Sequence, residues 1–279
     1  SSATSTPDTE RQAAEDGTRV AAPRSPRLVF AGAASIDLIF AVETLPPGPG
    51  KVLPKALVQV AHGMATSAAT AAARLGGDCA LIARIGDDAF GDGFIADIEK
   101  EGVDCRFVRR VENVPTPLSA VMVDGAGERL IVTYYDPALG NDPNWIAEDF
   151  VAAADAVQVD VRWPQGAARV LDIARAAGRP AVLDADVGPV ETTAMLAERA
   201  SHIVFSEPAA LAVSGETSIA QAVATLSRRF GGFVAVTGGA EGCFWLDGDA
   251  VRQQRPPRVE AVDTLAAGDV FHGAFTLAL

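Results

Sequence analysis

A polar turn runs directly into an apolar helical pattern near the end of the chain, at residues 262–275, "VDTLAAGDVFHGAF". The small residues Ala266, Ala267 and Gly268 let a ligand approach the backbone closely. A helix that begins there presents unpaired N–H groups, which bind anions. Asp269 follows in the first turn, where a carboxylate can accept a hydroxyl proton. The combination predicts phosphoryl transfer to an alcohol, with helix capping as the alternative role of the aspartate.

Short apolar runs alternate with helical stretches in the second half of the chain. Strands are expected at "AVQVDV", "PAVLDAD", "HIVFSEP" and "FVAVTGG", with helices such as "QGAARVLDIARAAG" between them. Repeated β-α-β units predict a parallel sheet covered by helices on both faces. Ligands bind beyond the carboxyl ends of such strands. The polar residues found there are Asp160, Arg162, Asp184, Asp186, Ser206, Glu207 and Thr237.

The first half of the chain contains further strand and helix signals. Residues 1–26 are polar and poor in large apolar side chains, which predicts a disordered tail. The apolar run "RLVFAGAASIDLIF" reads as a buried strand and "VLPKALVQVAHG" as an exposed one. "ATSAATAAARLG" predicts a helix that Gly76 and Gly77 end. "PLSAVMVDGAGERLIVTYY" predicts two strands around a turn.

Composition limits the classes of partner. The chain of 279 residues has 36 acidic and 23 basic residues and a net charge of -13. That balance argues against nucleic acid and anionic membranes, because both need clustered positive charge. No apolar run reaches the length of about 18 residues that a membrane span needs. The three cysteines show no metal or disulfide spacing, so a cytoplasmic protein is expected.

Several motifs together resemble one family. "DTLAAGD" resembles the D-T-x-G-A-G-D signature of the ribokinase (PfkB-type) carbohydrate kinases. "AGAASID", "HGMATSAATAAARLG", "ARIGDDAFG" and "AVTGGAEG" resemble further segments of that family in the same order. The resemblance covers residues 27–279. It implies ATP-dependent phosphorylation of a sugar hydroxyl with Mg²⁺.

The resemblance also implies an architecture. The family fold is an α/β domain with a doubly wound, mostly parallel sheet flanked by helices, plus a small β lid. The lid would be built here from residues near 40–62 and 105–135, and the family often uses it to form homodimers. Family members continue past this point with helices that close the adenine pocket, so the chain, which ends at Leu279, reads as a fragment that lacks them.

Roles for individual residues follow from the resemblance. Asp269 would be the general base, and the amides of Ala266, Ala267, Gly268 and Asp269 would hold the transferred phosphoryl group. The expected sugar-binding residues are Asp37, Lys51, Gly63, Ser67, Thr133 and Arg162. The expected nucleotide-binding residues are Thr237, Gly239, Gly242 and Thr264, and the expected metal ligands are Glu207 and Asp184.

Three positions depart from the family pattern. Ala266 stands where the signature has its first glycine, which a methyl group tolerates unless the residue needs a positive φ. Ala209 stands where a glutamate linked to the metal is expected, so Glu207 or Asp184 would replace it. Ser67 stands where ribokinases carry an asparagine. Ala266, Ala209 and the end of the chain at Leu279 favour, as an alternative, a sugar- or nucleotide-binding regulator with little catalytic activity.

The substrate is predicted from a narrower resemblance. "DVRW", "FSEP" and "DVFHGA" are similar to segments of the bacterial sulfofructose kinase branch, which phosphorylates 6-deoxy-6-sulfofructose at O1. Lys51 and Arg162 match residues that bind the sulfonate, whereas Thr133 replaces an asparagine. A fructokinase, a ketohexokinase and a 2-keto-3-deoxygluconate kinase are the alternatives. An adenosine-type kinase is less favoured, because the lid has few aromatic residues. His62 and His272 are not expected to bind metal.

Overall fold

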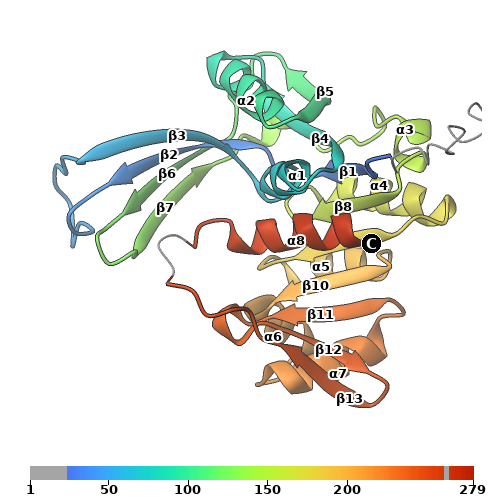
Figure 1. Ribbon diagram of the computed structural model, residues 1–279. Coiled ribbons are helices and arrows are strands. Elements are labelled where there is room, and N and C mark those ends of the chain that lie inside the picture. Colours follow the sequence, from blue (N-terminus) through green and yellow to red (C-terminus); the bar gives the residue numbers. More distant parts are fainter. Residues whose placement is uncertain (1–23, 261–263) are drawn as a thin grey trace, which may run out of the picture.

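Two β-sheets organise the chain (Figure 1). The computed structural model describes residues 24–260 and 264–279. The larger sheet has nine strands in the spatial order β13-β12-β11-β10-β9-β8-β1-β4-β5. These strands are β1 (Arg27–Ala31), β4 (Asp78–Gly86), β5 (Val103–Val111), β8 (Ala156–Asp160), β9 (Ala181–Ala185), β10 (His202–Ser206), β11 (Phe233–Thr237), β12 (Cys243–Asp247) and β13 (Ala250–Gln254).

The strands from β11 to β5 all pair in parallel, which confirms the predicted doubly wound sheet. From β1 the chain crosses to β4 and β5, and later returns to β8 on the other side of β1. The direction of winding therefore reverses beside β1, and this is where open α/β sheets form their ligand crevice. The antiparallel strands β12 and β13 at the sheet edge were not predicted.

Helices cover both faces of this sheet, because its strands are apolar on both sides. Leu28 and Phe30 of β1 belong to one core cluster, and Val29 and Ala31 belong to the other. The first face carries α1 (Met64–Arg74), α2 (Ala89–Lys100) and α8 (Ala267–Ala278). The second face carries α3 (Glu148–Ala152), α4 (Pro164–Ala176), α5 (Val190–Ala197), α6 (Glu207–Ser214) and α7 (Ile219–Arg229).

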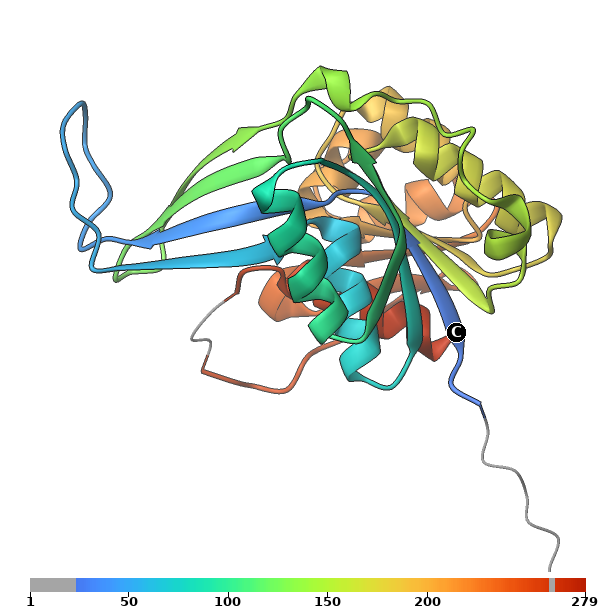
Figure 2. The ribbon, with the colours of Figure 1, turned by 90° about the horizontal axis from the view of Figure 1, so that it is seen from above.

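The second sheet is a four-stranded lid that projects from the main body near the start of α8 (Figures 1 and 2). Its spatial order is β3-β2-β6-β7, with β2 and β6 parallel and the outer pairs antiparallel. The strands are β2 (Ser35–Ala41), β3 (Ala56–His62), β6 (Leu118–Val123) and β7 (Arg129–Tyr134). The single strand predicted from "RLVFAGAASIDLIF" is in fact two, since the chain leaves β1 at Gly32 and enters the lid as β2.

One predicted boundary of the lid needs correction. Residues 105–111 were expected in the lid but lie in β5, which pairs in parallel with β4 in the larger sheet. The physical reason is burial: Val103, Cys105 and Val108 belong to the core cluster that α2 covers. The crossover through α2 therefore returns the chain to the main sheet before it reaches the lid at β6.

Residues 1–23 of the predicted tail lie outside the described residues. Arg24, which is described, pairs with Asp155 at 2.7 Å. The described helices include none with the length and apolar character that crossing a membrane requires. The three cysteines are free, as the sequence predicted.

Helix α8 is held against α1 at a very close approach. A Cβ atom at Gly273 of α8 would lie 2.2 Å from the backbone oxygen of Ala68 in α1. No real side chain tolerates that distance, so glycine sets the separation of the two helices. Because α8 carries Asp269 and α1 begins beside His62, this contact also sets the position of the candidate site.

We expect Gly273→Ala to destabilise the fold, because its methyl group must push the two helix backbones apart. Overpacking of this kind costs roughly 1–3 kcal/mol, which corresponds to roughly 3–10 °C in Tm for a domain of this size. Gly93→Ala in α2 is the matched control, since its Cβ would meet only Gln59 Nε2 at 3.6 Å. Thermal unfolding followed by circular dichroism measures both; equal Tm values for the two variants would contradict the close-packing explanation.

Candidate active site

A cavity of about 640 Å³ lies between the lid and the carboxyl ends of the main-sheet strands. Its lining comes from β2, β7, the ends of β8 to β11 and the first turn of α8. The sequence-predicted site residues that line it are Asp37, Gly63, Thr133, Arg162, Asp184, Thr237, Thr264, Ala266, Ala267, Gly268 and Asp269. The fold therefore brings residues that are more than 230 positions apart into one cavity.

The turn before α8 has the geometry of an anion site. Ala266 is the N-cap residue with φ 57° and ψ 14°, a left-handed conformation that is strained for alanine. The first intrahelical bond runs from Val270 N to Ala266 O. Within the described residues, the N–H groups of Gly268 and Asp269 have no backbone acceptor. They are free to donate to a ligand in the cavity.

Asp269 is a largely buried carboxylate whose pKa is raised. Its side chain is 14% exposed. Burial and, second, the negative charge of Asp184 raise the pKa of Asp269 to about 7, while His272 opposes the shift. A carboxylate with a pKa near 7 accepts a proton much more readily than an ordinary aspartate at neutral pH.

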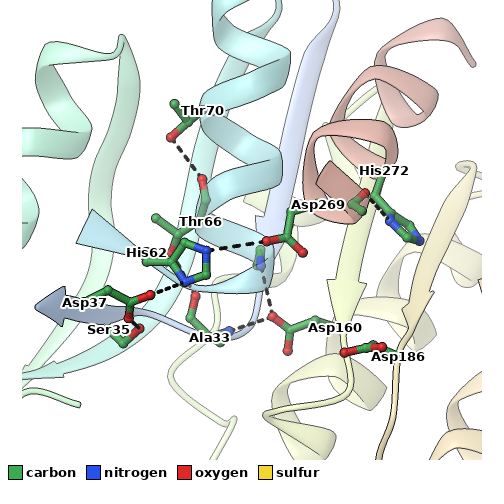
Figure 3. Close-up of polar contacts among 12 residues, drawn as sticks. Ala33, Ser35, Asp37, His62, Thr66, Thr70, Asp160, Asp186, Asp269 and His272 are labelled. Atoms are coloured by element: carbon green, nitrogen blue, oxygen red, sulfur yellow. Dashed lines mark hydrogen bonds and ion pairs between the residues drawn. The ribbon is translucent and has the colours of Figure 1, made fainter. Parts of the chain in front are cut away.

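His62 lies between two carboxylates at the base of the lid (Figure 3). Its Nδ1 is 3.1 Å from Asp37 Oδ2, and its Nε2 is 3.8 Å from Asp269 Oδ2. Nε2 is buried and has no hydrogen-bond partner within the described residues. The imidazole thus connects the expected sugar-binding aspartate with the expected base. The sequence placed a histidine beside Gly63 but gave no signal that it would touch both acids.

A second pair of acids lies at the ends of β8 and β9, and of the two only Asp184 lines the cavity. Asp160 is fully buried, and burial raises its pKa even though three backbone N–H groups donate to it. Asp184 is also buried, and burial together with the charge of Asp160 raises its pKa well above the usual range. Asp184 Oδ1 lies 3.3 Å from His272 Nε2, and its Oδ2 has no partner in the described part of the chain.

Five expected site residues do not line the cavity: Lys51, Ser67, Gly239, Gly242 and Glu207. Lys51 is exposed in the loop that joins two lid strands, and Ser67 lies one turn inside α1. Glu207 is exposed at the start of α6. Gly242 has a packing role instead, since its Cβ would lie 2.0 Å from Gln254 O.

Two cavity residues that carry charge were given no site role by the sequence, although Asp186 was noted at a strand end. Arg84 lines the cavity from β4. Its segment, "ARIGDDAFG", was noted only for its resemblance to the family and was assigned no ligand. Asp186 lines it as well and pairs with Arg162 at 3.3 Å. Both follow apolar strand residues, and that position at a strand end was the only signal in the sequence.

Known proteins of similar sequence and structure include sugar kinases. Mouse (Mus musculus) ribokinase is 26% identical over 271 residues, which span 90% of this chain and 81% of the ribokinase. A Vibrio alginolyticus fructokinase is 26% identical over 268 residues, spanning 89% of this chain and 82% of the fructokinase.

Solved structures show the same likeness. A ribokinase-like protein of Agrobacterium tumefaciens is 45% identical with a TM-score of 0.88, over 91% of this chain and 84% of that one. Arabidopsis thaliana ribokinase, solved with ribose and ATP, is 26% identical with a TM-score of 0.74, over 92% and 86%. The sequence profile of the pfkB family carbohydrate kinases matches residues 25–279. The chain therefore belongs to the pfkB family of carbohydrate kinases, which transfer a phosphoryl group from ATP to a sugar hydroxyl.

Proposed function

We propose that Asp269 is the general base of this kinase and that the first turn of α8 binds the phosphoryl group in transfer. The observation that carries the proposal is the cavity itself. It joins Asp37 in the lid, the free amides of Gly268 and Asp269, and Thr237 at the end of β11. A sugar at the lid end and a nucleotide at the β11 end would meet at α8.

The chemistry follows from these positions. Asp37 accepts hydrogen bonds from sugar hydroxyls and holds the acceptor oxygen near Asp269. That oxygen forms a bond to the γ-phosphorus as the bond to the β-phosphate oxygen breaks, and the electron pair leaves with ADP. Asp269 takes the hydroxyl proton. The amides of α8 stabilise the charge on the equatorial oxygens.

Magnesium would neutralise phosphate charge in this reaction. Of the two ligands expected from the sequence, only Asp184 lines the cavity, and its Oδ2 is without a partner among the described residues. The described residues contain no group of three or more His, Cys, Asp or Glu side chains that could hold a metal ion. This fits an ion that keeps phosphate and water ligands and takes one protein carboxylate, for which we propose Asp184 rather than Glu207.

The choice of sugar rests on weaker observations. Arg162, expected to bind a sulfonate, lines the cavity but already pairs with Asp186 and donates to Val187 O at 2.9 Å. Lys51, its expected companion, does not line the cavity. The named relatives above are ribokinases and a fructokinase. The proposal therefore covers ribose, fructose, 6-deoxy-6-sulfofructose and 2-keto-3-deoxygluconate as acceptors.

We also propose that two copies of this chain associate through the lid. Apolar side chains of its outer strands are exposed, including Leu57 (57%), Val132 (63%) and Tyr134 (54%). Exposed apolar patches of this kind mark interaction surfaces on soluble proteins. Burying them against a second lid would remove apolar area from water.

We expect Asp269→Asn to abolish sugar-dependent ADP release, since the amide cannot accept the hydroxyl proton. Loss of a general base lowers the rate roughly 10²- to 10⁴-fold. The control is Asp92→Asn, an exposed aspartate of α2 whose one ion pair among the described residues is with Arg110. Each protein is assayed with Mg-ATP and each of the four sugars.

Two outcomes would contradict the proposal. If Asp269→Asn keeps activity within tenfold of the wild type, Asp269 is not the base. If the wild type itself releases no ADP with any of the sugars, the chain is better explained as a sugar- or nucleotide-binding regulator.

The raised pKa of Asp269 predicts the pH dependence of the reaction. The base must be deprotonated, so kcat/KM is low below its pKa and rises as the pH passes through about 7. It then levels off above roughly pH 8. Initial rates at low sugar concentration, measured from about pH 5.5 to about pH 9, test this. A profile that is flat from pH 5.5 upward would show that Asp269 titrates like an ordinary aspartate.

The lid proposal is tested by Val132→Lys, which places a charge on the exposed apolar strand β7. We expect sedimentation velocity to show a dimer for the wild type and a monomer for the variant. Val251→Lys on β13, where the valine is 39% exposed, is the control and leaves the dimer intact. A monomeric wild type would refute association through the lid.

A further inference from the structure

Arg84 is a charged residue in an apolar setting. It lies near the carboxyl end of β4, a strand whose residues from Cys79 to Gly86 are all buried. Only 5% of Arg84 is exposed, yet it lines the cavity. Arginine is almost never buried to this extent unless it is paired with an acid.

No acid pairs with it within the described residues. Its Nη1 donates to the backbone oxygen of Gly140 and lies 3.5 Å from Asn141 Oδ1. The guanidinium stacks over the ring of Trp163, 4.1 Å from its centroid. Its Nε is buried and has no hydrogen-bond partner in that part of the chain. Burial lowers the pKa of Arg84, while the neighbouring phenol of Tyr135, whose ring centroid is 5.9 Å away, and the charge of Asp160 oppose the shift.

The acid whose charge acts on Arg84 already has other partners. Asp160 attracts Arg84 at longer range, but its two oxygens accept the N–H groups of Ala33, Ala65 and Arg162. Other arginines of the chain differ: Arg162 and Arg110 are more exposed and have aspartate partners. A buried, unpaired guanidinium is costly, so a counter-charge from a ligand would stabilise it.

The position of Arg84 indicates which ligand supplies that charge. In the main sheet, β4 is five strand positions from β11, which carries Thr237. At about 4.8 Å per strand this is roughly 24 Å, so Arg84 lies away from the nucleotide end. Neutral hydroxyl groups of Ser119 and Thr133 from the lid line the same cavity. They are suited to the uncharged part of a sugar.

We propose that Arg84 binds an anionic group of the sugar substrate, so that this kinase prefers a sugar that carries a carboxylate, sulfonate or phosphate. The inference rests on the proposed sugar-kinase function and deepens it. Arginine suits this role because its planar group binds such anions through two parallel N–H donors while its face stacks on an aromatic ring. It replaces Lys51 and Arg162 as the expected determinant of a charged substrate.

The test compares charged and neutral sugars in matched variants. The wild type, Arg84→Gln, Arg84→Lys and Arg109→Gln are assayed with fructose, fructose 6-phosphate, 6-deoxy-6-sulfofructose, 2-keto-3-deoxygluconate and ribose. Arg109 is the control, because it is exposed on β5 and also stacks on a tryptophan, Trp145, at 5.6 Å. Isothermal titration with each sugar, without nucleotide, measures binding independently of turnover, and Tm reports on folding.

We expect the wild type to prefer one of the charged sugars over fructose and ribose in kcat/KM. Arg84→Gln should lower kcat/KM for that charged sugar roughly 10- to 100-fold, as for a lost charged hydrogen bond. It should change the neutral sugars much less. Arg84→Lys keeps part of the preference, and Arg109→Gln keeps all of it. The sugar that responds identifies the anionic group.

Three results would overturn the inference. A wild type that prefers a neutral sugar refutes it while leaving the kinase proposal intact. An equal loss for charged and neutral sugars in Arg84→Gln, with a lower Tm, shows that Arg84 only anchors the segment at Gly140. If no sugar is turned over, the kinase proposal fails. The titrations then test the anion site by themselves: if the wild type and Arg84→Gln bind the charged sugars equally well, Arg84 does not bind their anionic group.

Discussion

The carboxylate of Asp160 is the contact on which the geometry of the cavity depends. It is fully buried at the end of β8 and accepts the N–H groups of Ala33 at 2.8 Å and Ala65 at 3.0 Å. It also accepts that of Arg162 at 2.8 Å. One side chain therefore joins the exit of β1, the start of α1 and the end of β8. Gly32 is required beside it, because a Cβ there would lie 2.1 Å from Asp160 Oδ2.

Asp37 and His62 are positioned from this point (Figure 3). Asp37 follows the exit of β1 into the lid, and His62 precedes the start of α1, so both are placed by backbone that Asp160 holds. Asp269 is placed by the close packing of α8 on α1 at Gly273. Asp269 is largely buried beside Asp184, and burial first and the neighbouring negative charge second raise its pKa to about 7.

The sequence predicted the sheet, because its signals are local. Apolar runs with polar ends identified β8 to β11, and their alternation with helices predicted the parallel order. The same reasoning failed at Gly32, where one apolar run forms β1 in the larger sheet and β2 in the lid. It also failed for β5, which was assigned to the lid but lies in the larger sheet. A strand pattern shows that a segment is extended, but the sheet it joins depends on which partner buries it.

For the site, the sequence by itself determined the chemistry of the residue types. "DTLAAGD" placed small residues, free amides and a carboxylate at one helix start, and the charge of -13 restricted the class of ligand. Only the tertiary structure decided which side chains share the cavity. It excluded Lys51 and Glu207, brought His62 between two acids, and left Arg84 buried without a counter-charge. These are contacts between distant segments, and burial and pairing are properties of such contacts rather than of residue type or spacing.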